Sequence, residues 1–146
     1  MTDRRTNIDR LYEGLTFVSR QSRELGAQLH PGLSLVAHSL LSFIDAEPDT
    51  RAADVAAAYG LDKSTVSRQI AELETAGLLT RAEERPGRRG HVLQLTKAGT
   101  QALKRAADSS RKTLAAHLTD WQDEDVEALA ALLARFAETS RRARHS

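Results

Sequence analysis

The chain has 146 residues, of which 40% are hydrophobic and only 4% aromatic, and its formal net charge is +1. A chain of this length forms one domain, or two that share a core. Alanine and leucine supply most of the apolar surface, which favours helices over strands. The absence of cysteine excludes a disulfide framework, thiol redox sensing and zinc sites built from thiolates. Because the net charge is small, any nucleic-acid signal has to come from the distribution of charge.

The N-terminal sequence MTDRRTNIDRLYEG lacks the apolar core of a signal peptide. No apolar run approaches the roughly 20 residues that are needed to cross a bilayer. We therefore expect a soluble, cytoplasmic protein with no membrane partner.

The first organised segment runs from about Asn7 to Leu29 and has the spacing of a single helix. Its apolar residues recur at alternating steps of three and four, with Ser22 filling the one gap: Ile8, Leu11, Leu15, Val18, Leu25 and Leu29. This spacing predicts a narrow seam of the coiled-coil kind. The pair HP at 30–31 ends the helix, because the residue before a proline avoids the helical region. A second, strongly apolar helix is expected from Leu33 to Ala46.

The next two helices are short and lie on either side of a glycine. Thr50 is expected to cap a helix over Arg51–Tyr59, and Gly60 permits a sharp turn after it. Asp62 can then cap a helix that ends at Gly77 and buries an apolar face made of Val66, Ile70 and Leu73. Two short helices joined by a tight glycine turn indicate a helix-turn-helix.

Two short strands follow, over Leu78–Ala82 and His91–Leu95, joined by the Pro- and Gly-containing loop ERPGRRG. Thr96 begins a long helix that ends at about Leu118. A final amphipathic helix is defined by the apolar residues Val126, Leu129, Leu132, Leu133 and Phe136. A basic tail, RRARHS, ends the chain.

The start of the helix after Asp62 carries an unusual number of short hydrogen-bonding side chains, which are mediocre helix formers. In a helix-turn-helix, these positions of the second helix face base edges in the major groove. The polar residues lie off the apolar face and are of types that contact bases and phosphates: Lys63, Ser64, Thr65, Ser67, Arg68 and Gln69. The alternative is a solvated helix start whose hydroxyls serve only as caps.

The loop between the strands is the second basic element, since it contains Arg85, Arg88 and Arg89. Residues 62–105 hold nine Lys or Arg against five Asp or Glu, so this region is basic and the remainder of the chain is acidic. A basic loop beside a recognition helix reaches the adjacent minor groove or the phosphate backbone.

The segment Leu61–Gly99, LDKSTVSRQIAELETAGLLTRAEERPGRRGHVLQLTKAG, resembles the recognition helix and wing of MarR-type winged-helix regulators. The matching segment ends in the motif formed by Leu95, Thr96 and Gly99. The long helices that flank this segment also fit the family. The segment departs from the family at Gly87, where an Asp often holds the wing in place, and Glu83 and Glu84 are the candidate substitutes for that carboxylate.

The resemblance implies a mainly α (α+β) winged helix-turn-helix fold with long N- and C-terminal dimerisation helices. It assigns residues 1–30 to an N-terminal dimerisation helix, 31–100 to the DNA-binding domain and 101–146 to C-terminal dimerisation helices. A two-fold dimer would bury the two apolar helix faces and place two recognition helices about 34 Å apart, which favours pseudo-palindromic sites. An intramolecular bundle is the alternative.

The family also binds small phenolic or carboxylate effectors between its dimerisation and DNA-binding regions. The resemblance places His30 and His38 near such a pocket, and the candidate residues for it are Tyr12, Phe17, His30, His38 and Phe43. For the two histidines, a structural or solvent-exposed role is the favoured alternative. The histidine spacing is not that of a metal site, and no phosphate loop, metal motif or nucleophile elbow is present. We therefore expect no enzyme activity, no metal and no cofactor.

The sequence thus predicts a homodimeric, sequence-specific regulator that binds double-stranded DNA, more often a repressor than an activator in this family. Two alternatives stay open at this point. A sequence-tolerant, nucleoid-type protein would bind by electrostatics alone, and a protein-interaction module would use its winged helix for another protein.

Overall fold

The computed structural model describes residues 1–84, 86–87 and 89–144. In these residues the chain is mainly helical, with one small two-stranded sheet. The elements in chain order are α1 (Arg4–Arg20), α2 (Ser22–Leu29), α3 (Leu35–Ala46), α4 (Ala52–Tyr59), α5 (Lys63–Thr75), β1 (Leu79–Arg81), β2 (Leu93–Leu95), α6 (Lys97–His117) and α7 (Asp123–Arg144). None of the helices in the described ranges is both long enough and apolar enough to pass through a membrane.

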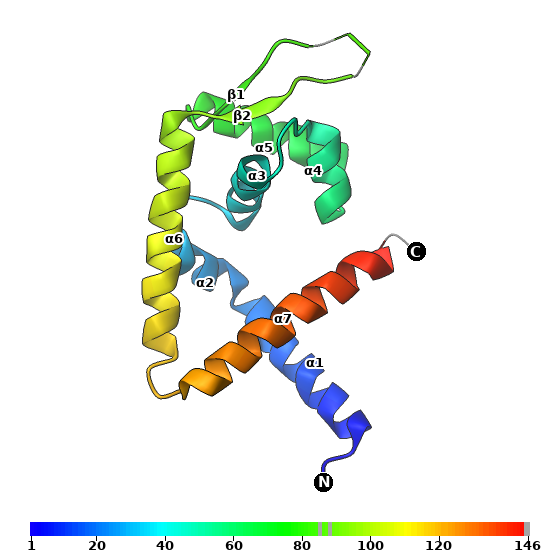
Figure 1. Ribbon diagram of the computed structural model, residues 1–146, viewed down its shortest axis with the longest axis vertical. Coiled ribbons are helices and arrows are strands. Elements are labelled where there is room, and N and C mark those ends of the chain that lie inside the picture. The colour runs from blue at the N-terminus through cyan, green and yellow to red at the C-terminus, as the bar shows by residue number, and fades with distance from the viewer. Residues whose placement is uncertain (85, 88, 145–146) are drawn as a thin grey trace.

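Helices α3, α4 and α5 and the two strands form one half of the molecule around one hydrophobic core (Figure 1). The core is centred on side chains that are almost completely buried, contributed by three helices: Leu40, Leu41, Val55, Val66 and Ile70. The apolar face predicted for the second helix of the motif is confirmed, because Val66, Ile70 and Leu73 are all buried. Burial of these aliphatic side chains supplies most of the stabilisation of this half.

The N-terminal helix is not continuous, which corrects the expectation of one helix from Asn7 to Leu29. The helix breaks at Gln21, whose φ and ψ are −94° and 1°. The Ser22 hydroxyl donates to the Ser19 carbonyl (2.8 Å), and the Gln21 N–H is shared between the carbonyls of Phe17 and Val18. Local side-chain bonding of this kind competes with the regular helical ladder.

Helix α4 begins one residue later than expected, and Thr50 does not cap it. Arg51 holds the position before the first turn, and its N–H donates to the Asp54 carboxylate (2.8 Å). The Thr50 hydroxyl donates instead to the Glu47 carbonyl (2.6 Å). The turn to α5 follows the prediction: Gly60 has a left-handed φ of +63°, and the Asp62 carboxylate accepts from the Thr65 N–H (2.7 Å).

Strands β1 and β2 are antiparallel, with Leu79 opposite Leu95 and Arg81 opposite Leu93. Both are shorter than predicted, although the Ala82 N–H still donates to the Val92 carbonyl beyond the ladder. On its other side, β2 is tied to the connection before α4 by a bond from the Leu93 N–H to the Thr50 carbonyl (2.8 Å). The base of the hairpin is therefore bonded directly to the helix-turn-helix.

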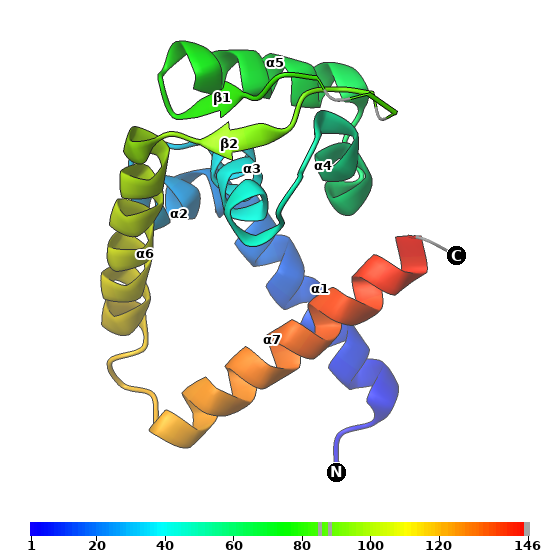
Figure 2. The ribbon, with the colours of Figure 1, turned by 45° about the horizontal axis from the view of Figure 1, so that its top comes forward.

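The outer helices extend away from this half. Helix α6 runs from the strands along one side of the molecule, and α7 returns towards α4 (Figures 1 and 2). Neither α1 nor α7 contains a buried residue, and both expose large apolar side chains. The exposed apolar residues of these two helices are Ile8, Leu11, Tyr12, Leu15, Phe17, Val18, Leu129, Leu132, Leu133 and Phe136.

Candidate nucleic-acid interface

The polar residues at the start of α5 face away from the core, as the helical spacing predicts. Lys63, Ser64, Ser67 and Arg68 are exposed, whereas Thr65 and Gln69 are half-buried. The Ser64 hydroxyl donates to the Asp62 carboxylate (2.8 Å), so it also takes part in the cap. The structure therefore brings all six predicted residues to one helix start, with four of them open to solvent.

Asp62 keeps its negative charge throughout the physiological range. Its pKa is lowered to about 2, first by the hydrogen bond from the Thr65 N–H and then by the Ser64 hydroxyl. A charged carboxylate at a helix N-terminus also interacts favourably with the helix dipole. The start of α5 is thus fixed by its own cap.

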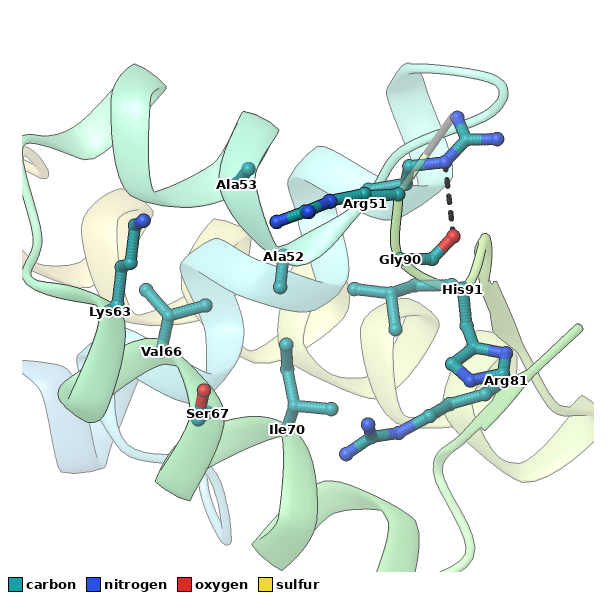
Figure 3. Close-up of a pocket in the computed structure, with 12 residues that line it drawn as sticks. Arg51, Ala52, Ala53, Lys63, Val66, Ser67, Ile70, Arg81, Gly90 and His91 are labelled. Carbon is teal, nitrogen blue, oxygen red and sulfur yellow. Dashed lines mark hydrogen bonds between the residues drawn. The ribbon is translucent and has the colours of Figure 1, made fainter. Parts of the chain in front are cut away.

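A groove of about 300 Å³ separates α5 from the hairpin and from the start of α4. Figure 3 shows Lys63, Ser67 and Ile70 on the α5 side, with Arg51 and His91 across from them. Arg81 and Arg89 also line the groove, while Val66, Ile70 and Leu93 provide apolar surface. None of the described residues that line it is acidic. The groove therefore presents positive charge from two directions to any anion that enters it.

The hairpin beyond the strands is the predicted wing. Arg89 is exposed and lines the groove, whereas Arg85 and Arg88 lie outside the described residues. At the base of the hairpin, the His91 Nδ1 donates to the Ala82 carbonyl (2.7 Å). The Glu84 carboxylate accepts from the Gly90 N–H (3.1 Å), so Glu84, one of the two acids suggested as substitutes for an Asp at position 87, does contact the wing.

Two residues of this region were missed by the sequence reasoning. Arg81 lines the groove and pairs with Glu74 (Nε to Oε1, 2.8 Å). Arg51 is buried, and its guanidinium donates to the Gly90 carbonyl (Nε, 3.3 Å) and to the Asp49 carbonyl (Nη1, 3.1 Å). The arginine at the start of a short predicted helix was the available signal for a role of Arg51. Its partner Gly90, however, lies 39 residues further along the chain.

The five residues suggested for an effector pocket occupy three separate places. His30 and His38 stack with ring centroids 4.6 Å apart, where α2 leads into α3. Phe43 instead packs edge-on against Tyr59 of α4, at 5.9 Å. Tyr12 and Phe17 are exposed on α1, and Phe17 borders a hollow shared with α2 and His117. In the described part of the chain, no group of three or more His, Cys, Asp or Glu side chains could hold a metal ion.

Residues 32–90 match the model of the MarR family. The chain is 30% identical over 126 residues to the uncharacterized HTH-type transcriptional regulator YxaD of Bacillus subtilis (strain 168), which covers 86% of this chain and 88% of that protein.

Solved structures share the fold over almost the whole chain. A MarR family protein from Bacillus stearothermophilus superposes with a TM-score of 0.77 at 16% identity, covering 96% of this chain and 99% of that one. RV1404 from Mycobacterium tuberculosis gives a TM-score of 0.72 at 20% identity and covers 96% of each chain.

Proposed function

The chain belongs to the MarR family of transcriptional regulators, and from this premise we propose that it is a homodimeric, sequence-specific DNA-binding repressor. Members of this family are DNA-binding regulators and not enzymes. The observation that supports the specific role is the basic groove between α5 and the wing, with Lys63, Ser67 and Arg89 on its walls. We place its action in the cytoplasm, together with the DNA.

In the proposed complex, α5 enters the major groove of each half-site. Arg68 and Gln69 read base edges, while Lys63 and the hydroxyl residues at 64, 65 and 67 bind phosphates or bases. The arginines of the wing, at positions 85, 88 and 89, contact the neighbouring minor groove or backbone. Occupation of a site near a promoter then excludes the polymerase.

The exposed apolar faces of α1 and α7 support pairing with a second copy. Roughly ten large side chains lie open on these helices, and burying each one contributes about 1.5–3 kcal/mol of gross stabilisation. A two-fold dimer buries the same face of both copies. It also places the two recognition helices about 34 Å apart, which matches pseudo-palindromic half-sites.

A small aromatic or carboxylate effector would act on the geometry of this dimer. The region where α2, α3 and α6 meet joins the two functional halves, and His30 and His38 lie there. A ligand that binds better to a dimer with displaced recognition helices weakens DNA binding. Typical coupling of 1–3 kcal/mol corresponds to about 5- to 150-fold relief of repression.

Fluorescence anisotropy on the DNA upstream of the protein's own gene tests the proposal. A scrambled duplex of equal length and composition is titrated in parallel at two salt concentrations. Binding that is about 10³-fold tighter or more on the natural duplex supports specific recognition. Equal affinity for both duplexes, tested again on genomic fragments, would instead indicate a nucleoid-type protein, and no binding at low salt would point to a protein partner.

A further inference from the structure

The second arm of the wing is held at one residue, Gly90, through both its N–H and its carbonyl. The Gly90 N–H donates to the Glu84 carboxylate (3.1 Å), and the Gly90 carbonyl accepts from the Arg51 guanidinium (3.3 Å). Figure 3 shows the bond between Arg51 and Gly90 across one end of the groove. Gly90 has a φ of +88°, a conformation that residues with a side chain rarely adopt. Its neighbour Arg89 lines the groove.

Arg51 is well placed to act as a fixed anchor. Its residue is only 6% exposed, and its backbone N–H is bonded to Asp54 within the first turn of α4. A second guanidinium nitrogen donates to the Asp49 carbonyl (3.1 Å). A buried cation is costly unless it is hydrogen-bonded, and here two backbone carbonyls accept from it. The guanidinium therefore joins the body of the helix-turn-helix to the wing.

Glu84 anchors the same residue, Gly90, from the opposite arm of the hairpin. It is exposed, and its bond to Gly90 spans six residues of the wing. A loop with Pro86 and two glycines at positive φ, Gly87 and Gly90, has many alternative conformations to lose. Hydrogen bonds to both the N–H and the carbonyl of Gly90 restrict those alternatives before DNA arrives.

We propose that Arg51 and Glu84 are positioning residues that clamp the backbone of Gly90 and thereby aim Arg89 at DNA. This inference rests on the proposed DNA-binding function. Neither residue needs to contact DNA itself: Arg51 is buried, and Glu84 is negatively charged and would be repelled by phosphates. The clamp acts on the wing alone, so contacts made by α5 do not depend on it.

Glu84 offers a variant pair that does not disturb the core. Glu84→Ala removes the acceptor, whereas Glu84→Gln keeps an acceptor oxygen at the same reach. We expect Glu84→Ala to weaken binding to the natural duplex by about the factor that Arg89→Ala does, and Glu84→Gln to stay close to the wild type. Equal losses in both variants, or a loss in neither, would overturn the clamp.

Arg51 is tested by Arg51→Met, which removes the donors, and by Arg51→Lys, which keeps the charge but not the two-carbonyl geometry. Arg51→Met is expected to lower the slope of log affinity against log salt as Arg89→Ala does, and Arg51→Lys to lie in between. Arg111→Met, on the exposed surface of α6, removes one positive charge elsewhere and controls for net charge. An unchanged slope in a folded Arg51→Met protein would contradict the proposal.

A double-variant cycle separates positioning from direct contact. If Arg51 acts through the wing, Arg51→Met has little further effect on DNA affinity once Arg89 is already Ala and the other wing arginines are removed. Full additivity would mean that Arg51 contributes independently of the wing, and would overturn the assignment.

Amide hydrogen exchange of the free protein provides a readout that needs no DNA. Arg51→Met and Glu84→Ala should each speed exchange in residues 82–92 and leave α5 unchanged. If the wild type failed to bind DNA while exchange responded in this way, the proposed function would be wrong and the clamp correct. Unchanged exchange in both folded variants would reject the clamp, whatever the DNA result.

Discussion

The Cα of Gly99 packs directly against the backbone carbonyl of Leu78. A Cβ added to Gly99 would overlap the Leu78 oxygen and lie 3.0 Å from its carbonyl carbon. The same carbonyl accepts a hydrogen bond from the Thr96 N–H (3.1 Å), and the Thr96 hydroxyl donates to the Gly77 carbonyl (2.6 Å). The Thr-x-x-Gly motif thus holds the first turn of α6 against the end of the recognition helix.

Gly99→Ala should therefore destabilise the protein, because the new methyl group meets backbone that cannot turn aside. We expect a loss of about 1–3 kcal/mol in the free energy of unfolding, measured by urea denaturation. Gly14→Ala is the matched control, since nothing lies within 4 Å of the added Cβ in α1. That change should stabilise the helix by about 0.5–1 kcal/mol. Equal effects of the two changes would contradict the packing described for Gly99.

Replacement of Arg68 by alanine tests base reading by α5. If Arg68 makes a bidentate base contact, Arg68→Ala costs about 1–3 kcal/mol of affinity for the natural duplex. Binding to scrambled DNA should change much less. Equal losses on both duplexes, measured by anisotropy, would make Arg68 a phosphate contact instead.

Arg89→Ala tests the contact of the wing with the DNA backbone. Each phosphate contact that is lost lowers the slope of log affinity against log salt by about 0.9. We expect a decrease of that size from titrations at several salt concentrations. A slope equal to that of the wild type would show that Arg89 does not neutralise a phosphate.

Acidification should weaken the fold through His38. The pKa of His38 is lowered, first by burial and then by the positive charge of His30, and the hollow beside it also holds Asp45 and Lys104. The folded state therefore binds fewer protons than the unfolded state just below pH 6.5. The free energy of unfolding falls as pH drops from about 6.5 towards the lower folded pKa, by at most about 1.4 kcal/mol per pH unit for one group.

Urea denaturation of the wild type and of His38→Gln at several pH values measures this contribution. The variant should lose part of the pH dependence. His117→Gln, on the exposed last turn of α6, is the matched control and should retain it. An identical pH profile for the wild type and His38→Gln would show that the stacked pair does not contribute.

Pairing of two copies is tested on α7. Leu133→Glu places a charge on the exposed apolar face and should convert the proposed dimer into a monomer in sedimentation equilibrium. Glu127→Ala changes the same helix away from that face and should leave the mass unchanged. Wild-type protein that sediments as a monomer would instead support the intramolecular alternative.

The helix-turn-helix could be predicted from sequence because its determinants are local. Asp62 caps the helix that it precedes, Gly60 takes the left-handed turn, and Val66 and Ile70 repeat at helical spacing. The break at Gln21 depends instead on local hydrogen bonding: the Ser22 hydroxyl donates to the Ser19 carbonyl, and the Gln21 N–H is shared between two carbonyls. The spacing of apolar residues does not reveal such bonds.

The support of the wing could not be predicted for a different reason. Arg51 and Gly90 are distant in sequence, and only the folded chain shows that they meet. Thr50 has the side chain of a good cap, yet its backbone carbonyl is occupied by Leu93, and the chain enters α4 through Arg51. Long-range pairing decided both positions against local preference.

The uncovered apolar faces of α1 and α7 have a consequence for how the protein responds to its own abundance. If these faces are covered only by a second copy, mass action links the stability of α1 and α7 to the amount of protein present. At concentrations below the pairing constant, the number of molecules competent to occupy an operator rises with the square of the total. A modest change in synthesis or dilution by growth would then switch a promoter sharply, before any small molecule is bound.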